Sequence, residues 1–174
     1  MNIVKTPLID CTVIEPKIYE DDRGFFYESF QEKKYREIAG INHKFVQDNF
    51  SFSKKNVLRG LHFQKKNSQG KLVMVPQGEV FDVAVDLRKD SASFKHWFGI
   101  NLSESNRKQL WIPPGFAHGF LVLSDYACFE YKCTNYYDPN DEFSLLWNDP
   151  EIGISWPTNN PLLSEKDANG NLFK

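Results

Sequence analysis

The chain has 174 residues and a net charge of −2, from 23 acidic and 21 basic side chains; 41% of its residues are hydrophobic and 15% are aromatic. This length fits one domain, residues 1–174, with a hydrophobic core of its own, and the aromatic content excludes a disordered chain. The balanced charge excludes the basic surface that binds nucleic acid, and no apolar run approaches the ~18 residues that cross a membrane.

Two short strands are predicted near the N-terminus. Residues 12–19 and 25–30 alternate between apolar and polar side chains, which is the pattern of a half-buried strand. The acidic run over 20–24 ends in glycine and has the composition of a turn. We therefore expect two strands joined by a turn.

A single helix is predicted over 31–39. Ser29 and Glu32 have the S-x-x-E spacing of a capping box, which satisfies free amide groups at the start of a helix. Gly40 follows the last helical residue, where glycine is the preferred C-cap.

Strands dominate the remainder of the chain, and glycine or proline stands at nearly every junction between them. Many short strands at regular spacing are typical of a β-sandwich or barrel. The predicted strands are 44–52, 56–63, 71–76, 79–87, 96–102, 109–112, 118–123, 127–136 and 143–147.

The strand over 79–87 has two different faces. Alternate positions from Phe81 to Leu87 are all apolar, so this face is predicted to be core. Asp82 and Asp86 lie on the other face. That face either lines a wet cavity or faces solvent, and solvent is the commoner situation for a single strand.

The strand over 127–136 places Phe129, Tyr131 and Cys133 on one side. Tyr131 therefore lies on the apolar face, where a phenol needs a hydrogen-bond partner. Taken alone, Tyr131 is interpreted as a core tyrosine with a satisfied hydroxyl group.

The run Val57-Leu-Arg-Gly-Leu-His-Phe-Gln64 contains an irregularity. Arg59 and His62 have opposite parity, so a regular strand would direct them to opposite faces. If both serve one pocket, Gly60 must mark a bulge or a sharp coil. Arg59 also lies inside an apolar run, where a guanidinium group needs an anionic partner in the protein or in a ligand.

Two of the four histidines are candidates for chemistry. His43 and His96 lie in polar, turn-like surroundings, whereas His62 and His118 lie in apolar strands close to glycines that permit the close approach of a ligand. A lone histidine in such a strand is commonly a core residue. Two of them together indicate a site.

The metal-ligand pattern around these histidines is incomplete. Pro113-Pro-Gly-Phe-Ala-His118 resembles the second half of a cupin signature, but residues 62–64 have the sequence His-x-Gln where a cupin has His-x-His. Val122, four residues after His118, cannot bind a metal. We therefore expect no metal site and consider metal-free acid/base chemistry in a cupin-like barrel.

Cysteine usage predicts the compartment. Cys11, Cys128 and Cys133 are odd in number and lack the spacing of a zinc site or a disulfide scaffold. Polar residues follow Met1, without the apolar stretch of a signal peptide. The interpretation is a cytoplasmic protein with small, buried or half-buried thiols.

Longer strings resemble one known family from the N-terminal turn to the C-terminal segment. They include Asp22-Arg-Gly-Phe-Phe26, Val57-Leu-Arg-Gly-Leu-His-Phe-Gln64, Gly115-Phe-Ala-His-Gly-Phe120 and Ser164-Glu-Lys-Asp167. In their order along the chain, these strings resemble the dTDP-4-dehydrorhamnose 3,5-epimerase family. The resemblance implies an all-β jelly-roll (cupin) fold with a few short helices, a homodimer, and catalysis without a metal or organic cofactor.

The resemblance also implies a reaction and the residues that perform it. The substrate is dTDP-4-keto-6-deoxy-D-glucose, inverted at C3 and C5 by proton removal next to the C4 ketone and reprotonation from the opposite face. In this family His62 matches the base, Asp167 the partner of its other ring nitrogen, Tyr131 the acid, and Lys71 the group that stabilises the C4 oxyanion. The positions that match substrate-binding residues are Arg23, Phe26, Glu28, Gln47, Asp48, Asn49, Arg59, His118, Glu142 and Lys166.

Other functions on the same scaffold remain open at this point. One is an epimerase that acts at a single carbon, and another is an isomerase that moves the ketone from C4 to C3. A cupin that binds a sugar nucleotide without catalysis would have no use for an acid and a base. A metal-dependent oxygenase ranks last because its ligands are missing.

Overall fold

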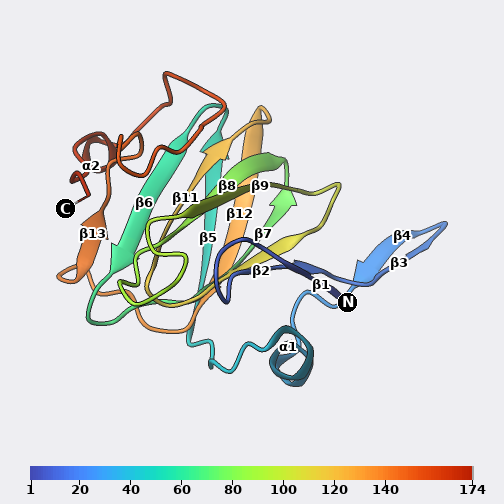
Figure 1. The fold of residues 1–174 in the computed structure, drawn as a ribbon. Coiled ribbons are helices and arrows are strands. Elements are labelled where there is room, and N and C mark those ends of the chain that lie inside the picture. The colour runs from blue at the N-terminus through green and yellow to red at the C-terminus, as the bar shows by residue number, and fades with distance from the viewer. Residues whose placement is uncertain (174) are drawn as a thin grey trace.

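The computed structural model describes residues 1–173 and shows a β-rich fold with two short helices (Figure 1). The helices are α1 (Glu32–Ala39) and α2 (Glu165–Ala168). The strands are β1 (Asn2–Lys5), β2 (Thr12–Glu15), β3 (Ile18–Asp21), β4 (Gly24–Tyr27), β5 (Gln47–Lys54), β6 (Leu58–Gln64), β7 (Lys71–Gln77), β8 (Glu79–Asp86), β9 (Trp97–Ser103), β10 (Gln109–Ile112), β11 (Phe116–Val122), β12 (Tyr126–Cys133) and β13 (Glu142–Ser144).

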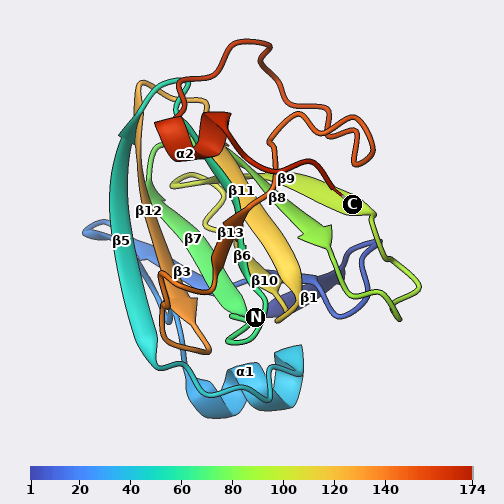
Figure 2. The same ribbon diagram turned by 90° about the vertical axis from the view of Figure 1, so that its left-hand side faces the viewer.

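Two antiparallel sheets pack face to face, as the predicted jelly roll requires (Figure 2). One sheet has six strands in the order β1-β2-β10-β7-β12-β5, and the other has five in the order β13-β6-β11-β8-β9. Strands β3 and β4 form a separate hairpin that projects away from both sheets (Figure 1). The all-β jelly-roll prediction is confirmed.

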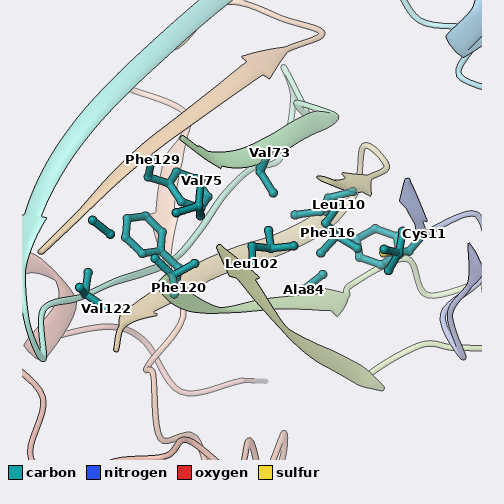
Figure 3. Close-up of a cluster of buried hydrophobic side chains, with 14 of the residues drawn as sticks. Cys11, Val73, Val75, Ala84, Leu102, Leu110, Phe116, Phe120, Val122 and Phe129 are labelled. Atoms are coloured by element: carbon teal, nitrogen blue, oxygen red, sulfur yellow. The ribbon is translucent and has the colours of Figure 1, made fainter. Parts of the chain in front are cut away.

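The main core fills the space between the two sheets (Figure 3). Val73 from β7, Leu110 from β10 and Ala84 from β8 are fully buried there, and the Phe120 and Phe129 rings stack with centroids 4.1 Å apart. These apolar residues occupy one part of the interior. The polar residues of the candidate site occupy the rest.

Each sheet also has a covered outer face. On the six-stranded sheet, α1 and the segment after it bury Ile14, Leu72 and Trp111. On the five-stranded sheet, the C-terminal segment covers Val83 and Val85 of β8. Both faces of β8 are therefore buried.

Of the two possibilities left open for the Asp82 face of β8, the commoner one, exposure to solvent, is wrong. Asp82 and Asp86 are both 0% exposed. This face points into the molecule, and alternation alone cannot distinguish a polar interior face from a solvated one.

The structure differs from the predictions at two places near the N-terminus. The predicted strand 12–19 is divided at Pro16 into β2 and β3, because β2 pairs with β1 while β3 turns away into the hairpin. The Ser29–Glu32 capping box is absent: Gln31 is the N-cap, and its side chain accepts a hydrogen bond from the Lys34 amide at 2.6 Å. The Ser29 carbonyl oxygen lies 2.8 Å from the Tyr35 hydroxyl oxygen and accepts a hydrogen bond from the Gln109 side-chain amide at 2.7 Å.

Gly40 ends α1 in the left-handed conformation, with φ +71°, as predicted. Strand β1 and helix α2 were not predicted. Helix α2 has only four residues and is too short for a periodic signal, yet it carries one of the predicted catalytic residues, Asp167.

Candidate active site

Strand β6 contains a bulge between Arg59 and His62. Their opposite parity in the sequence requires such a break if both side chains are to serve one pocket. In the ladder between β6 and β11, His62 pairs with His118 and Arg59 pairs with Phe120, so the register shifts between them. Gly60 lies in this shift with φ +108°, and a Cβ atom there would lie 2.5 Å from the His118 carbonyl oxygen. The prediction that Gly60 marks a break in the strand is confirmed, and no larger residue fits.

His62 and Asp167 form a hydrogen-bonded pair. The His62 Nε2 atom lies 2.6 Å from Asp167 Oδ1, and the carboxyl group is buried while the imidazole is 29% exposed. The Ser164 hydroxyl caps α2 and also donates to Asp167 Oδ2 at 2.8 Å, which fixes the carboxyl group. Burial raises the pKa of Asp167, but the hydrogen bonds from His62, Ser164 and the Gly60 amide outweigh it and hold this pKa below its usual value.

This contact determines which ring nitrogen is available. An ionised carboxylate can only accept a hydrogen bond, here from Nε2–H, so Nδ1 of a neutral His62 carries the lone pair. No hydrogen bond engages Nδ1 in residues 1–173. The pairing of His62 with Asp167 is as the resemblance implied, and it leaves one basic nitrogen for a ligand.

A second histidine–carboxylate pair lies beside the first. His118 Nε2 is 2.9 Å from Asp82 Oδ2, and both side chains are buried. Burial lowers the pKa of His118, and the neighbouring Lys71 and His62 lower it further, although Asp82 opposes both effects. His118 is therefore neutral near pH 7.

Tyr131 and Lys71 come from the opposite sheet. Tyr131 on β12 lies in register between Val73 of β7 and Asn49 of β5, and Lys71 Nζ lies 5.9 Å from the centre of the Tyr131 ring. Burial raises the pKa of Tyr131 to about 12 and lowers the pKa of Lys71. The phenol therefore keeps its proton at neutral pH.

The expectation that Tyr131 is satisfied as a core tyrosine is wrong. Its ring packs against the core, but within residues 1–173 its hydroxyl group makes no hydrogen bond. Lys71 Nζ likewise has no ion pair or hydrogen bond in that part of the chain. Both groups are free to bind a ligand.

Charge effects connect these groups across the space between the sheets. Glu142 on β13 influences the pKa of both Lys71 and Tyr131, and His62 influences the pKa of Glu142. Such effects act over short distances in a partly buried site. The imidazole, the ammonium group and the phenol therefore all lie within the range over which the Glu142 charge acts.

Polar residues of β5 extend this surface. Gln47 and Asn49 lie on the inner face, where the Gln47 Nε2 atom donates to Asn49 Oδ1 at 3.1 Å. Asp48 alternates to the outer face, and its carboxylate binds Lys132 at 2.9 Å. The structure thus brings Gln47 and Asn49 to the site, and the Asp48 side chain away from it.

Arg59 is exposed, although it lies inside an apolar run of the sequence. Its Nε atom donates to the Ser53 hydroxyl at 2.9 Å, and no carboxylate of residues 1–173 pairs with it. Nearby, Lys166 contacts Glu142, which also accepts the Tyr137 hydroxyl at 2.8 Å. Burial raises the pKa of Glu142, but the bonds from Lys166 and Tyr137 dominate and keep this pKa low.

Three predicted binding residues lie away from this space. Arg23 and Phe26 belong to the projecting hairpin; the Arg23 side chain is 90% exposed and pairs with Asp21, and Phe26 is 69% exposed. Glu28 follows the hairpin and pairs with Lys34 at 2.9 Å. Within one chain the hairpin of β3 and β4 projects away from β6, the strand that carries His62 (Figure 1).

The residues that the structure describes contain no group of three or more histidine, cysteine, aspartate or glutamate side chains placed to hold a metal. The Gln64 amide, at the position of a cupin ligand, donates to the backbone carbonyl of Asn67 at 2.7 Å. Its role here is to fix a loop. The same described residues include no helix that is long and apolar enough to cross a membrane.

Sequence reasoning missed Asp82, Cys133 and Ser164 at this site. Asp82 lies on the face of β8 that points between the two sheets. The available signal was that Asp82 and Asp86 share this face in the alternating pattern of the strand. Cys133 shares the inner face of β12 with Tyr131 and pairs with Lys71 across the ladder. Ser164 stands three residues before Asp167, at N-cap spacing.

Comparison with known proteins identifies the family. The family described as dTDP-4-dehydrorhamnose 3,5-epimerase matches residues 5–174. The enzyme of that name from Salmonella typhimurium is 58% identical over 170 residues, which cover 97% of this chain and 93% of that protein. A dTDP-6-deoxy-D-glucose-3,5-epimerase from Legionella pneumophila, crystallised with dTDP-4-keto-L-rhamnose, is 57% identical with a TM-score of 0.95, covering 98% of this chain and 92% of that one.

A more distant structure is a 3'-monoepimerase from Streptomyces bikiniensis in complex with dTDP-quinovose. It is 30% identical with a TM-score of 0.88, over 96% of this chain and 85% of that one. The match to the 3,5-epimerases is both closer and nearly complete along the chain. The protein belongs to the dTDP-4-dehydrorhamnose 3,5-epimerase family.

Proposed function

We propose that residues 1–174 form one catalytic domain that converts dTDP-4-keto-6-deoxy-D-glucose into dTDP-4-keto-L-rhamnose by inverting C3 and C5. The observation that carries this proposal is the placement of His62 on one sheet, paired with Asp167 of helix α2, and of Tyr131 with Lys71 on the other sheet. An epimerase that works through an enolate needs a base, an acid on the other side of the sugar, and a donor to the enolate oxygen. These four residues supply all three.

His62 is the base in this mechanism. Its Nδ1 atom removes the proton from a carbon next to the C4 ketone, and the electron pair moves onto the ketone oxygen to give an enolate. Asp167 stabilises the imidazolium that forms, because its carboxylate stays ionised. The Lys71 ammonium group stabilises the negative charge on the oxygen at C4.

Tyr131 completes each inversion. Its hydroxyl group delivers a proton to the same carbon from the opposite side as the enolate collapses to the ketone. A phenol whose pKa is raised to about 12 is protonated before the reaction. Afterwards His62 returns its proton to solvent and Tyr131 takes one up, which resets the site for the second carbon.

The remaining predicted residues are assigned to the substrate's polar groups. Arg59 is exposed, and no carboxylate of residues 1–173 pairs with it. Its planar guanidinium group can donate two parallel hydrogen bonds to the diphosphate. Gln47, Asn49 and His118 present side-chain polar groups to the interior. Glu142 and Lys166 lie at the edge of the same space as a contacting pair. At Asp48 the main chain, and not the side chain, is assigned to substrate binding.

The exposed hairpin supports a homodimer. If Arg23, Phe26 and Glu28 bind the substrate, they do so in the site of a second copy, because the hairpin projects away from its own sheets (Figure 1). Arg107 holds the hairpin in this direction through an ion pair with Glu20 at 2.9 Å and a contact with the Phe25 ring at 3.8 Å.

The outer face of β5 offers a surface on which a second copy can pack. Phe50 and Phe52 are 65% and 55% exposed there, and Phe52 stacks on Tyr126 of β12. Exposed aromatic clusters of this kind mark protein contacts.

Mixing two inactive variants tests this arrangement. One chain carries His62→Ala, and the other carries Arg23→Ala with Phe26→Ala. If hairpins serve the partner's site, random re-association of equal amounts should restore about a quarter of wild-type activity, since half of the dimers are mixed and each has one intact site. Activity that stays at the level of the separate variants would place the hairpin in its own site or outside any site.

The reaction itself is tested by incubation with dTDP-4-keto-6-deoxyglucose in D₂O. We expect one deuterium at C3 and one at C5, with inverted configuration at both, followed by NMR and mass spectrometry. Label at one carbon only would indicate a single-carbon epimerase like that of Streptomyces bikiniensis. A ketone at C3 would indicate an isomerase, and binding without exchange would indicate a non-catalytic cupin.

We further propose that the protein works in the cytoplasm and without a cofactor. All three cysteines are free thiols, and Cys11 and Cys133 are buried, which fits a reducing compartment. The proposed proton transfers balance without any further group.

A further inference from the structure

The mechanism above gives no role to Asp82, a carboxyl group in the interior. Asp82 is 0% exposed on β8, and its Oδ2 atom is engaged by His118 Nε2. Its Oδ1 atom is buried and has no hydrogen-bond partner in residues 1–173. A buried carboxylate with an unsatisfied oxygen is costly, so its retention in an apolar wall calls for a functional reason.

The charged and titratable groups around Asp82 point to Lys71. Asp82 lies on the inner face of one sheet, next to Phe120 of β11, and Lys71 lies on the facing sheet. The negative charge of Asp82 raises the pKa of Lys71, and no ion pair joins the two side chains within residues 1–173. The other titratable groups near Lys71 are His118 from β11, Glu142 from β13, and Cys133 and Tyr131 from β12.

Most of these neighbours carry no free negative charge. Glu142 is already neutralised by Lys166. Burial raises the pKa of Cys133 and of Tyr131, so both keep their protons, and His118 is neutral. Asp82 is therefore the negative charge near Lys71 that no cation neutralises by direct contact.

On the basis of the proposed function, we propose that Asp82 is a positioning residue that keeps the Lys71 ammonium group charged while the reaction runs, and that its bond with His118 anchors the carboxylate for this purpose. The lysine then remains free of a direct ion pair, so its ammonium hydrogens are available to the C4 oxygen. A direct ion pair would occupy them.

The physical reason is the burial of Lys71. Desolvation lowers the pKa of this lysine, and Asp82 works against that effect. An uncharged amine gives little stabilisation to an enolate oxygen, because the charge of the ammonium group is lost. Removing the negative charge of Asp82 should therefore move the deprotonation of Lys71 to lower pH.

Asp82→Asn tests the inference through the pH profile of kcat/KM, with rates corrected for the folded fraction. We expect the alkaline limb, on which activity falls as Lys71 loses its proton, to move down by about 1 pH unit or more, as for the loss of one nearby charge in a partly buried site. Should this variant not fold, Asp82→Leu removes the same charge and fits the apolar wall.

Asp86→Asn is the matched control. Asp86 lies on the same strand and face and is equally buried, but it is held by Arg88, Ser91 and Ser93. We expect this variant to lose stability and to keep the wild-type alkaline limb. An equal shift in both variants would overturn the inference.

A second readout measures Lys71 directly. The rate at which an acylating amine reagent modifies Lys71 is followed against pH by peptide mass spectrometry, with the surface residue Lys89 as internal reference. The midpoint for Lys71 should fall in Asp82→Asn and stay in place in Asp86→Asn. If the reactivity of Lys71 is unchanged in Asp82→Asn, the role of Asp82 is overturned and the proposed function is unaffected. Full activity in Lys71→Met would instead overturn the proposed role of Lys71 itself.

Discussion

Replacing His62 with alanine should lower kcat/KM by about 10³, within the ~10²–10⁴ range that a general acid or base contributes. The substitution removes the imidazole ring whose Nε2 atom lies 2.6 Å from Asp167 Oδ1. The Nδ1 atom, which acts as the base, is lost with it. Proton exchange at C3 and C5 should fall together, because the same base is needed for both. Turnover of dTDP-4-keto-6-deoxyglucose and deuterium uptake from D₂O measure the two effects.

The control for this variant is His96→Ala, which removes an imidazole from a turn outside the site. Its activity should stay close to that of the wild type. Because the loss of His62 also removes a hydrogen bond to the buried Asp167 carboxyl group, a lower unfolding temperature is expected, and rates are corrected for the folded fraction. Wild-type turnover in His62→Ala would contradict the assignment of the base.

The β-rich fold was predictable because its signals are local. Alternation of apolar and polar residues identified nearly all strands, including β8 and β12, to within a few residues. Long-range contacts decided the remainder. The N-cap of α1 is Gln31, which the capping-box spacing did not indicate, and the four residues of α2 place Asp167 beside a histidine 105 positions earlier in the chain.

The site was predictable in part, and for different reasons at different residues. Parity showed that Gly60 had to break its strand if Arg59 and His62 shared a pocket, and the structure has that break. Parity could not show whether Asp82 faced water or a cavity, because both faces of a strand between two packed layers are buried. The roles of Tyr131 and Lys71 came from family resemblance, since neither residue stands out from its strand by pattern alone.

The hairpin shows a limit of another kind. Its sequence predicted a turn correctly, and the pairing of β3 with β4 confirms it. Which site Arg23 and Phe26 serve depends on an arrangement between two chains, which neither the pattern of one sequence nor the structure of one chain contains. The mixing experiment addresses that arrangement directly.

Replacing Tyr131 with phenylalanine should separate proton exchange from inversion. His62 can still remove a proton and return a deuteron on its own side of the sugar, so exchange at C3 should survive within about tenfold. Inversion needs a proton from the other side, so inversion at C5 should fall by about 10² or more. NMR of the product formed in D₂O reports label and configuration at each carbon.

The stability of this variant distinguishes chemistry from structure. The Tyr131 hydroxyl makes no hydrogen bond in residues 1–173, so removing it should change the unfolding free energy by less than about 1 kcal/mol. Tyr35→Phe is the matched control, because its hydroxyl donates to buried Gln109 at 2.7 Å on the outer face of the sheet. That variant should lose about 1–3 kcal/mol and keep its inversion chemistry. Equal inversion at C5 in Tyr131→Phe and wild type would show that another group delivers the proton.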